Sequence, residues 1–258
     1  LNKETANLIS IMLVSYIDTE SKGDIEVLKI LTKDSSEFLS KLEEWTKMED
    51  FPIINIGNVY RVVSVQDMWL FLADKIKKND IENLEKVISL IFSETTPKYD
   101  LPTEERSMAA ILGKNDKYSK QLIEGLLISL IFLKERDEMF SSTFIGSTKT
   151  VVNVLLKEIL SEINSEKQWL SIAEFLPLIS EACPQDVIEK LKKEKKNPES
   201  MFWEIFNVGE GNSLFSGNVY HHLLWAIERL LWMEDYAVDA ILLLVRIAQK
   251  QFTLPNGN

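Results

Sequence analysis

Apolar residues recur three and four positions apart along almost the whole chain, the spacing that places side chains on one face of a helix. Polar capping residues, prolines and glycines divide this pattern into short helices with short connections. Helices are predicted at residues 3–17, 24–31, 36–48, 64–78, 79–92, 103–112, 120–134, 148–163, 169–183, 184–196, 218–232 and 235–250. The sequence therefore predicts an all-α fold.

Individual residues indicate where some of these helices begin, which side they bury and where they bend. Asp24 is expected to be the N-cap of the second helix, and Ser119 the N-cap of the helix at 120–134. Trp69 and Leu70 are expected on the buried face of their helix. The segment 169–183 is expected to be one helix or a pair of helices, bent at Pro177.

The period changes in one region, where a β-rich run is interrupted by Gly57-Asn58, a pair that suits a hairpin turn. We therefore predict one β-hairpin at residues 53–63. Three helices followed by a hairpin is the order of a winged helix-turn-helix, so residues 1–63 are predicted to form an N-terminal winged-helix-like unit. The alternative is a simple β-arm on a helical domain.

Residues 64–258 are predicted to form an irregular, α-solenoid-like helical stack, because the helices follow one another without a fixed sequence period. The polar, proline-containing segment 93–102 is predicted to be a hinge. The last two helices are joined by only two or three residues, so they are expected to be antiparallel neighbours and the most buried pair.

Charge argues against nucleic acid as a partner. The chain has 29 basic and 40 acidic side chains, a net charge of −11, whereas binding to a phosphate backbone needs an excess of Lys and Arg. Residues 1–63 follow the same trend, with seven basic and eleven acidic side chains. A winged helix here is therefore expected to be structural or to dock protein rather than to bind DNA.

A cytoplasmic location is expected. Cys183 is the single cysteine, which excludes an internal disulfide framework and fits a reducing compartment. The longest nearly unbroken apolar stretch, 126–133, is far too short to cross a bilayer, so no membrane association is expected. Residue 1 is Leu rather than Met, which suggests a fragment of a longer protein.

The sequence offers no constellation for catalysis. The glycine-rich loop and lysine that bind nucleotide phosphates are absent, so no cofactor is expected. The only two histidines, His221 and His222, are adjacent and lie about 100° apart on a helix, so no metal site is expected. Cys183 has no cationic neighbour close in sequence and is expected to be a buried apolar residue.

One stripe on the helix 218–232 is a candidate for binding a partner. Its four residues are spaced three, four and three positions apart, which aligns them along one side of the helix: His222, Trp225, Arg229 and Trp232. Trp and Arg dominate protein-binding hot spots. The alternative is that the indoles pack inside the stack, with Arg229 over one of them.

Two sets of segments carry a family resemblance. Residues 169–173 (WLSIA), 176–184 (LPLISEACP) and 223–232 (LLWAIERLLW), with Tyr236, resemble the helical region of large bacterial STAND-type P-loop ATPases, which are multidomain signalling or antiphage-defence proteins. The segments that fall in the same order in the first half are 64–69 (SVQDMW), Arg106, Gly113-Lys114, Tyr118-Ser119 and Gly125-Leu126. The resemblance covers roughly residues 50 to 258.

The resemblance implies that an ATPase module precedes this region and that the helical part senses a ligand or viral protein and relays it to an effector. The ATPase and effector are missing from this chain, so neither activity is expected of it. We therefore expect a non-catalytic sensor or scaffold region that recognises a protein partner or other domains of the same polypeptide. The alternatives are an acidic winged-helix transcriptional regulator that binds DNA through residues 36–63, and a hydrolase that uses carboxylates in the groove of the stack.

Overall fold

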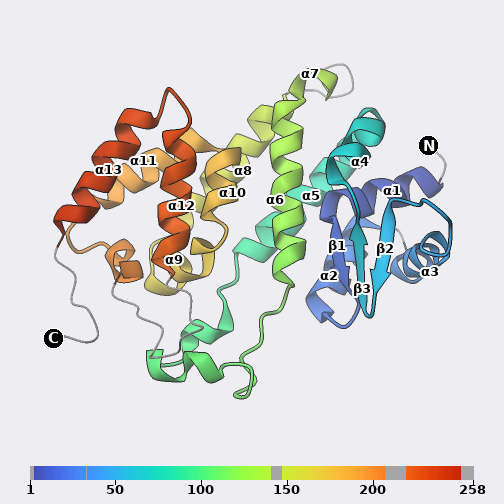
Figure 1. Cartoon of the computed structure of the whole chain (residues 1–258), viewed down its shortest axis with the longest axis horizontal. Coiled ribbons are helices and arrows are strands. Elements are labelled where there is room, and N and C mark those ends of the chain that lie inside the picture. The colour runs from blue at the N-terminus through green and yellow to red at the C-terminus, as the bar shows by residue number, and fades with distance from the viewer. Residues whose placement is uncertain (1–2, 33, 141–146, 207–218, 251–258) are drawn as a thin grey trace. The chain divides into compact units, whose positions relative to one another are not determined.

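The computed structural model describes residues 3–32, 34–140, 147–206 and 219–250 (Figure 1). It is 70% helical and contains a small three-stranded antiparallel sheet. The prediction of an all-α fold with one hairpin is therefore confirmed.

The chain divides into two units that are each discontinuous in sequence. Unit 1 contains residues 1–91 and 117–152, and unit 2 contains residues 92–116 and 153–258. The predicted boundary after residue 63 lies inside unit 1. The predicted hinge, 93–102, lies in unit 2, just after the chain first passes from unit 1 to unit 2.

The helices of unit 1 form wherever apolar residues recur at helical spacing between capping residues. In chain order they are α1 Lys3–Val14, α2 Lys22–Leu31, α3 Ser35–Trp45, α4 Val65–Leu72, the 3₁₀ helix η1 Ala73–Lys75, α5 Lys78–Phe92, whose last residue is in unit 2, α6 Lys120–Glu135 and α7 Asp137–Phe140.

The sheet of unit 1 contains the predicted hairpin and one strand that the sequence analysis missed. The strands β2 Ile53–Ile56 and β3 Val59–Val62 form the hairpin, whose turn includes Gly57 at φ 62°. The third strand, β1 Tyr16–Asp18, pairs antiparallel with β3, which gives the order β1-β3-β2. A strand between the first two helices that pairs with the second strand of the hairpin is the topology of a winged helix.

The prediction of a continuous helix over 3–17 was wrong at its end. α1 stops at Val14 because Ser15 adopts φ 58°, a left-handed conformation that a right-handed helix does not continue through. The chain then enters β1, where Ile17 is fully buried.

Asp24 has a different role from the predicted N-cap. The N-cap of α2 is Ser21, whose hydroxyl accepts from the Asp24 backbone N–H at 3.2 Å. The buried Asp24 carboxylate accepts from the Asp18 N–H at 3.0 Å, the Ser21 hydroxyl at 2.8 Å and the Ser119 N–H at 2.9 Å. The Ser119 hydroxyl also donates to Asp24 instead of capping α6. One carboxylate therefore joins the end of β1 to the starts of α2 and α6.

The helix α6 lies against α1 with unusually little space between the two backbones. A Cβ atom on Gly125 would lie 1.9 Å from the Val14 carbonyl oxygen, so only glycine fits. One turn further along α6, the buried Ser129 hydroxyl donates to the Leu13 carbonyl at 2.8 Å. That carbonyl is in the last turn of α1, where helix carbonyls lack a partner within the helix.

The helix α4 is shorter than predicted and buries one of the two residues expected to be inside. Trp69 is fully buried and stacks on Phe132 with ring centroids 5.2 Å apart. Leu70, however, is exposed, because it lies about 100° further around the helix than Trp69, beyond the side that buries Met68 and Trp69.

Unit 2 is built from short helices. In chain order these are the 3₁₀ helices η2 Pro97–Asp100 and η3 Thr103–Met108, then α8 Thr148–Glu162, which begins in unit 1, α9 Glu166–Ala173, α10 Leu176–Ala182, α11 Pro184–Glu194, the 3₁₀ helix η4 Met201–Phe206, α12 Tyr220–Leu231 and α13 Ala237–Gln249.

Proline sets the helix boundaries in the middle of unit 2. The segment 169–183 forms a pair of helices, α9 and α10, which is one of the two forms predicted for it. Pro177 lies in the first turn of α10, where a missing N–H costs no hydrogen bond. Cys183 follows α10 and is buried as expected, with its thiol donating to the Ile179 carbonyl at 3.3 Å. α10 packs closely against α12, and this pair forms the centre of the unit.

We predict that Gly125→Ala destabilises the protein although alanine is the better helix former by about 1 kcal/mol. The added Cβ must displace the Val14 carbonyl, and overpacking of this kind costs about 1–3 kcal/mol or more. Urea denaturation should show a lower free energy of unfolding. Gln121→Ala, on the exposed side of α6, is the control and should change it by less than about 0.5 kcal/mol. Equal stability of the parent and Gly125→Ala would contradict the described packing.

Candidate functional site

The tryptophans of the chain fall into two groups. Four of the six are 3% exposed or less: Trp45, Trp69, Trp169 and Trp203. The other two belong to the predicted stripe: Trp225 is 53% exposed and Trp232 is 84% exposed. The alternative in which these indoles pack inside the stack is therefore wrong.

The stripe lies on the side of α12 that faces away from the core of unit 2. The opposite side of the helix buries Leu223, Ala226, Ile227 and Leu230. Because this inner side is completely packed, the exposure of the indoles is imposed by the helix and is not a sign of loose packing.

The four predicted site residues make different contacts. His222 packs edge-on against Trp225, with ring centroids 5.1 Å apart and an angle of 86°. His221 also stacks on Trp225, at 6.4 Å. Arg229 forms an ion pair with Glu181 of α10 rather than covering an indole, and Trp232 is the C-cap residue of α12. The stripe therefore presents two indoles with a cation between them.

The helix α13 carries a second exposed apolar surface that the sequence analysis missed. Four side chains of this helix, which we call the outer stripe, are 48–70% exposed: Val238, Ile241, Leu242 and Val245. The opposite side of the helix buries Ala240, Leu243 and Ile247. The expectation that α12 and α13 are the most buried pair was therefore wrong, because α13 is apolar on two opposite sides and only one of them is buried. A helix that is apolar on two opposite sides is the signal that would have identified the outer stripe.

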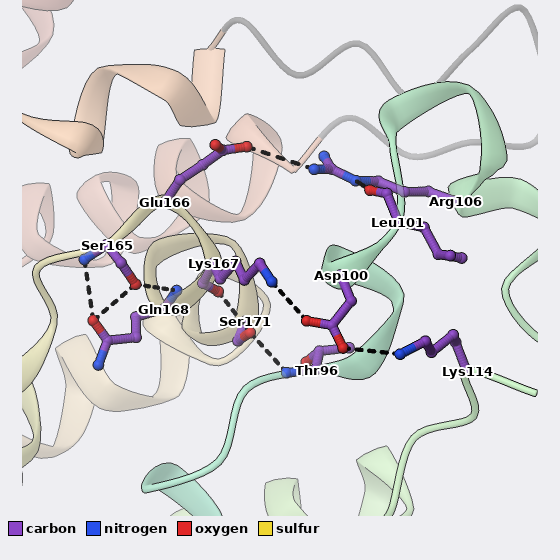
Figure 2. Close-up of polar contacts among 10 residues, drawn as sticks. All are labelled: Thr96, Asp100, Leu101, Arg106, Lys114, Ser165, Glu166, Lys167, Gln168 and Ser171. Atoms are coloured by element: carbon purple, nitrogen blue, oxygen red, sulfur yellow. Dashed lines mark hydrogen bonds and ion pairs between the residues drawn. The ribbon is translucent and has the colours of Figure 1, made fainter.

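A polar network in unit 2 connects the segment 96–114 to α9 (Figure 2). The Asp100 carboxylate accepts from Lys167 Nζ at 2.7 Å and from Lys114 Nζ at 3.1 Å. The Thr96 backbone N–H donates to the Ser171 hydroxyl at 2.8 Å. The two lysines hold the pKa of Asp100 below its ordinary value, Lys167 having the larger effect.

Arg106, one of the residues of the family resemblance, lies within the same network (Figure 2). Its side chain is 8% exposed, its Nε donates to the Leu101 carbonyl at 3.2 Å, and a terminal nitrogen is 3.5 Å from Glu166 of α9. The guanidinium also lies over the Tyr99 ring at 5.3 Å. These contacts fix the segment within unit 2, so Arg106 has a structural position and does not face an open site.

The helix α3, which would contact DNA in a winged helix, presents paired charges. Lys41 is paired with Glu44, Lys47 with Glu43 at 2.8 Å, and Lys3 of α1 with Glu37. The hydrogen bond from Lys47 lowers the pKa of Glu43, and the hydrogen bond to Glu44 raises the pKa of Lys41. Lys41 of α3 and Lys47, which follows the helix, thus each have a carboxylate beside them, which weakens their attraction for phosphate.

Within the part of the chain that the structure describes, no group of three or more His, Cys, Asp and Glu side chains is placed to hold a metal ion. No helix of this part is both long and apolar enough to cross a membrane.

Burial raises the pKa of Asp116, and the nearby Glu174 raises it further while Lys98 lowers it.

We predict that Trp225→Ala and Trp232→Ala each change the free energy of unfolding by less than about 1 kcal/mol, because both side chains are exposed. Trp169→Ala, which removes a buried indole from unit 2, is the matched comparison and should cost about 3–5 kcal/mol. Thermal or urea denaturation of the three variants checks this. A cost at Trp225 or Trp232 similar to that at Trp169 would mean that the stripe is part of a core.

We also predict that Asp100→Asn reduces hydrogen-exchange protection of the Tyr99 and Leu101 amides at pH 7, because the ion pairs to α9 and Lys114 are lost. Since the folded-state pKa is lowered, the contribution of Asp100 is fully present above the unfolded-state pKa of about 3.9 and disappears as the pH falls through the folded value. The difference between parent and variant should therefore vanish in acid. Glu104→Gln, an exposed neighbour, should leave protection unchanged at either pH.

Comparisons with known proteins returned no match: no family model, no curated protein and no solved structure matches this chain.

Proposed function

We propose that this chain is a non-catalytic helical sensor or scaffold region that binds a protein partner through α12, within a larger cytoplasmic STAND-type signalling or defence ATPase of bacteria. The observation that carries the proposal is the exposure of Trp225 and Trp232, while the other four tryptophans are buried. An indole on the surface leaves a large apolar area in contact with water. Burial of that area against a partner lowers the free energy.

The composition of the stripe supports a protein as the ligand. Trp and Arg are the residues most enriched in binding hot spots. Arg229 lies between the indoles and is held by Glu181, which reduces the side-chain entropy that it would lose on binding. His222 supports one face of Trp225, so that indole is also partly pre-organised.

The resemblance to STAND-type proteins supports the wider setting, because the segment 223–232 that carries its most specific part is the same segment that presents the stripe. In this setting the partner is a separate protein or another domain of the same polypeptide. The cytoplasmic location belongs to this proposal and agrees with the single buried cysteine.

DNA binding through the winged-helix topology is the second candidate. The strand order β1-β3-β2 favours it. The ion-paired Lys41 and Lys47 and the net charge of −11 argue against it, because duplex affinity requires cations that neutralise phosphates. We therefore favour protein recognition.

We predict that a photo-crosslinking amino acid at position 228, where Glu228 is an exposed residue of α12 and both indoles are kept, forms a discrete adduct in the natural host cells. A separate protein partner would give a band of higher mass, and another domain of the same polypeptide would give an internal crosslink visible by peptide mass spectrometry. Arg229→Glu should lower the yield, because the charge between the indoles is reversed.

The control is the same amino acid at position 71, where Phe71 is an exposed aromatic residue of unit 1. Adducts that are equally abundant at positions 71 and 228 would reflect random encounters. That result, or the absence of any adduct at 228, would contradict partner binding by the stripe.

A further inference from the structure

The outer stripe of α13 has the spacing of a helix–helix contact. Its members are separated by three, one and three positions, so they form a continuous apolar band along one side of the helix. The band lies on the side of α13 that is opposite to the side packed in unit 2. Nothing in this band is required for the fold of unit 2, which already uses the other side of α13.

The charges at the two ends of α13 are segregated by sign. Glu234 and Asp235 lie in the turn that precedes the helix, and Arg246 is in its last turn. Asp239, in the first turn, pairs with Lys192 at 2.9 Å. The outer stripe therefore lies between an acidic end and a basic end of the helix.

We propose that the outer stripe binds a second copy of this chain, with the two α13 helices antiparallel about a two-fold axis. This arrangement places Val238 of each copy against Val245 of the other, and Ile241 against Leu242. Antiparallel helices bring the basic end of each copy to the acidic end of the other, so Arg246 of one copy lies near Asp235 of the other, twice per dimer. Parallel helices would instead bring ends of like charge together, so the charge pattern favours the antiparallel dimer.

The size of the surface sets the strength of this association. A helix of 13 residues is about 20 Å long, and four aliphatic side chains on it bury much less than the roughly 800 Å² per partner of a standard interface. The dimer is therefore weak, and it forms readily only at high local concentration, such as inside a larger assembly. This self-association uses residues of α13 and is separate from partner binding by the α12 stripe.

Sedimentation equilibrium of the whole 258-residue chain tests the proposal, from low micromolar concentration to about 0.5 mM. The average mass of the parent should rise with concentration from 29.7 kDa towards the dimer value. Leu242→Glu should weaken the dimer about tenfold or more, because the charge enters the interface twice. Ile111→Glu, on another exposed aliphatic residue of unit 2, is the control and should have no effect.

Charge reversal identifies the partner as a second copy. Arg246→Glu and Asp235→Arg should each reduce self-association, since each places like charges together across the axis. An equimolar mixture of the two variants should associate at least as strongly as the parent, because both charge pairs are then complementary. A parent that remains at 29.7 kDa throughout, an equal loss in Leu242→Glu and Ile111→Glu, or a mixture that fails to associate would each overturn the proposal.

Discussion

The fold of unit 1 depends on the close approach of α6 to the point where α1 ends and β1 begins. Gly125 lets the two backbones meet, and Ser129 supplies the donor that the Leu13 carbonyl lacks at the end of α1. The Asp24 carboxylate fixes the start of α6 to the same region through Ser119. A buried carboxylate that accepts several hydrogen bonds is stable only while all of its donors are present, so these elements form together.

The sequence predicted the parts of unit 1 that are specified by local chemistry. Gly57 is the residue type that a hairpin turn with positive φ requires, and the hairpin is where it was expected. β1 was missed because Ile17 continues the apolar pattern of α1 and Ser15 carries no signal for a left-handed conformation. The bond between Asp24 and Ser119 spans 95 residues, and helical periodicity contains no information about contacts at that separation.

The sequence predicted part of the candidate site, because the spacing of residues along one helix is also a local property. Spacing aligned Trp225, Arg229 and Trp232 on one side of α12, and they lie there. Spacing alone does not tell which side of an apolar helix faces the core, because that depends on the neighbouring helix, here α10. The ion pair between Arg229 and Glu181 also joins two helices, and Glu181 stood out in the sequence only as part of a resemblance.

The surface charge explains how a chain with exposed indoles and an exposed aliphatic stripe avoids indiscriminate association. A net charge of −11 makes copies of the chain repel one another at long range, so apolar contact alone is insufficient to hold two copies together. Association requires a surface whose charges are also complementary, and the repulsion then rejects other orientations. Lys41, Lys47 and Lys114 are each paired with a carboxylate of their own unit, which leaves the acidic background in place. The α12 stripe and the outer stripe are thus apolar surfaces on an acidic protein, and this combination favours specific partners over aggregation.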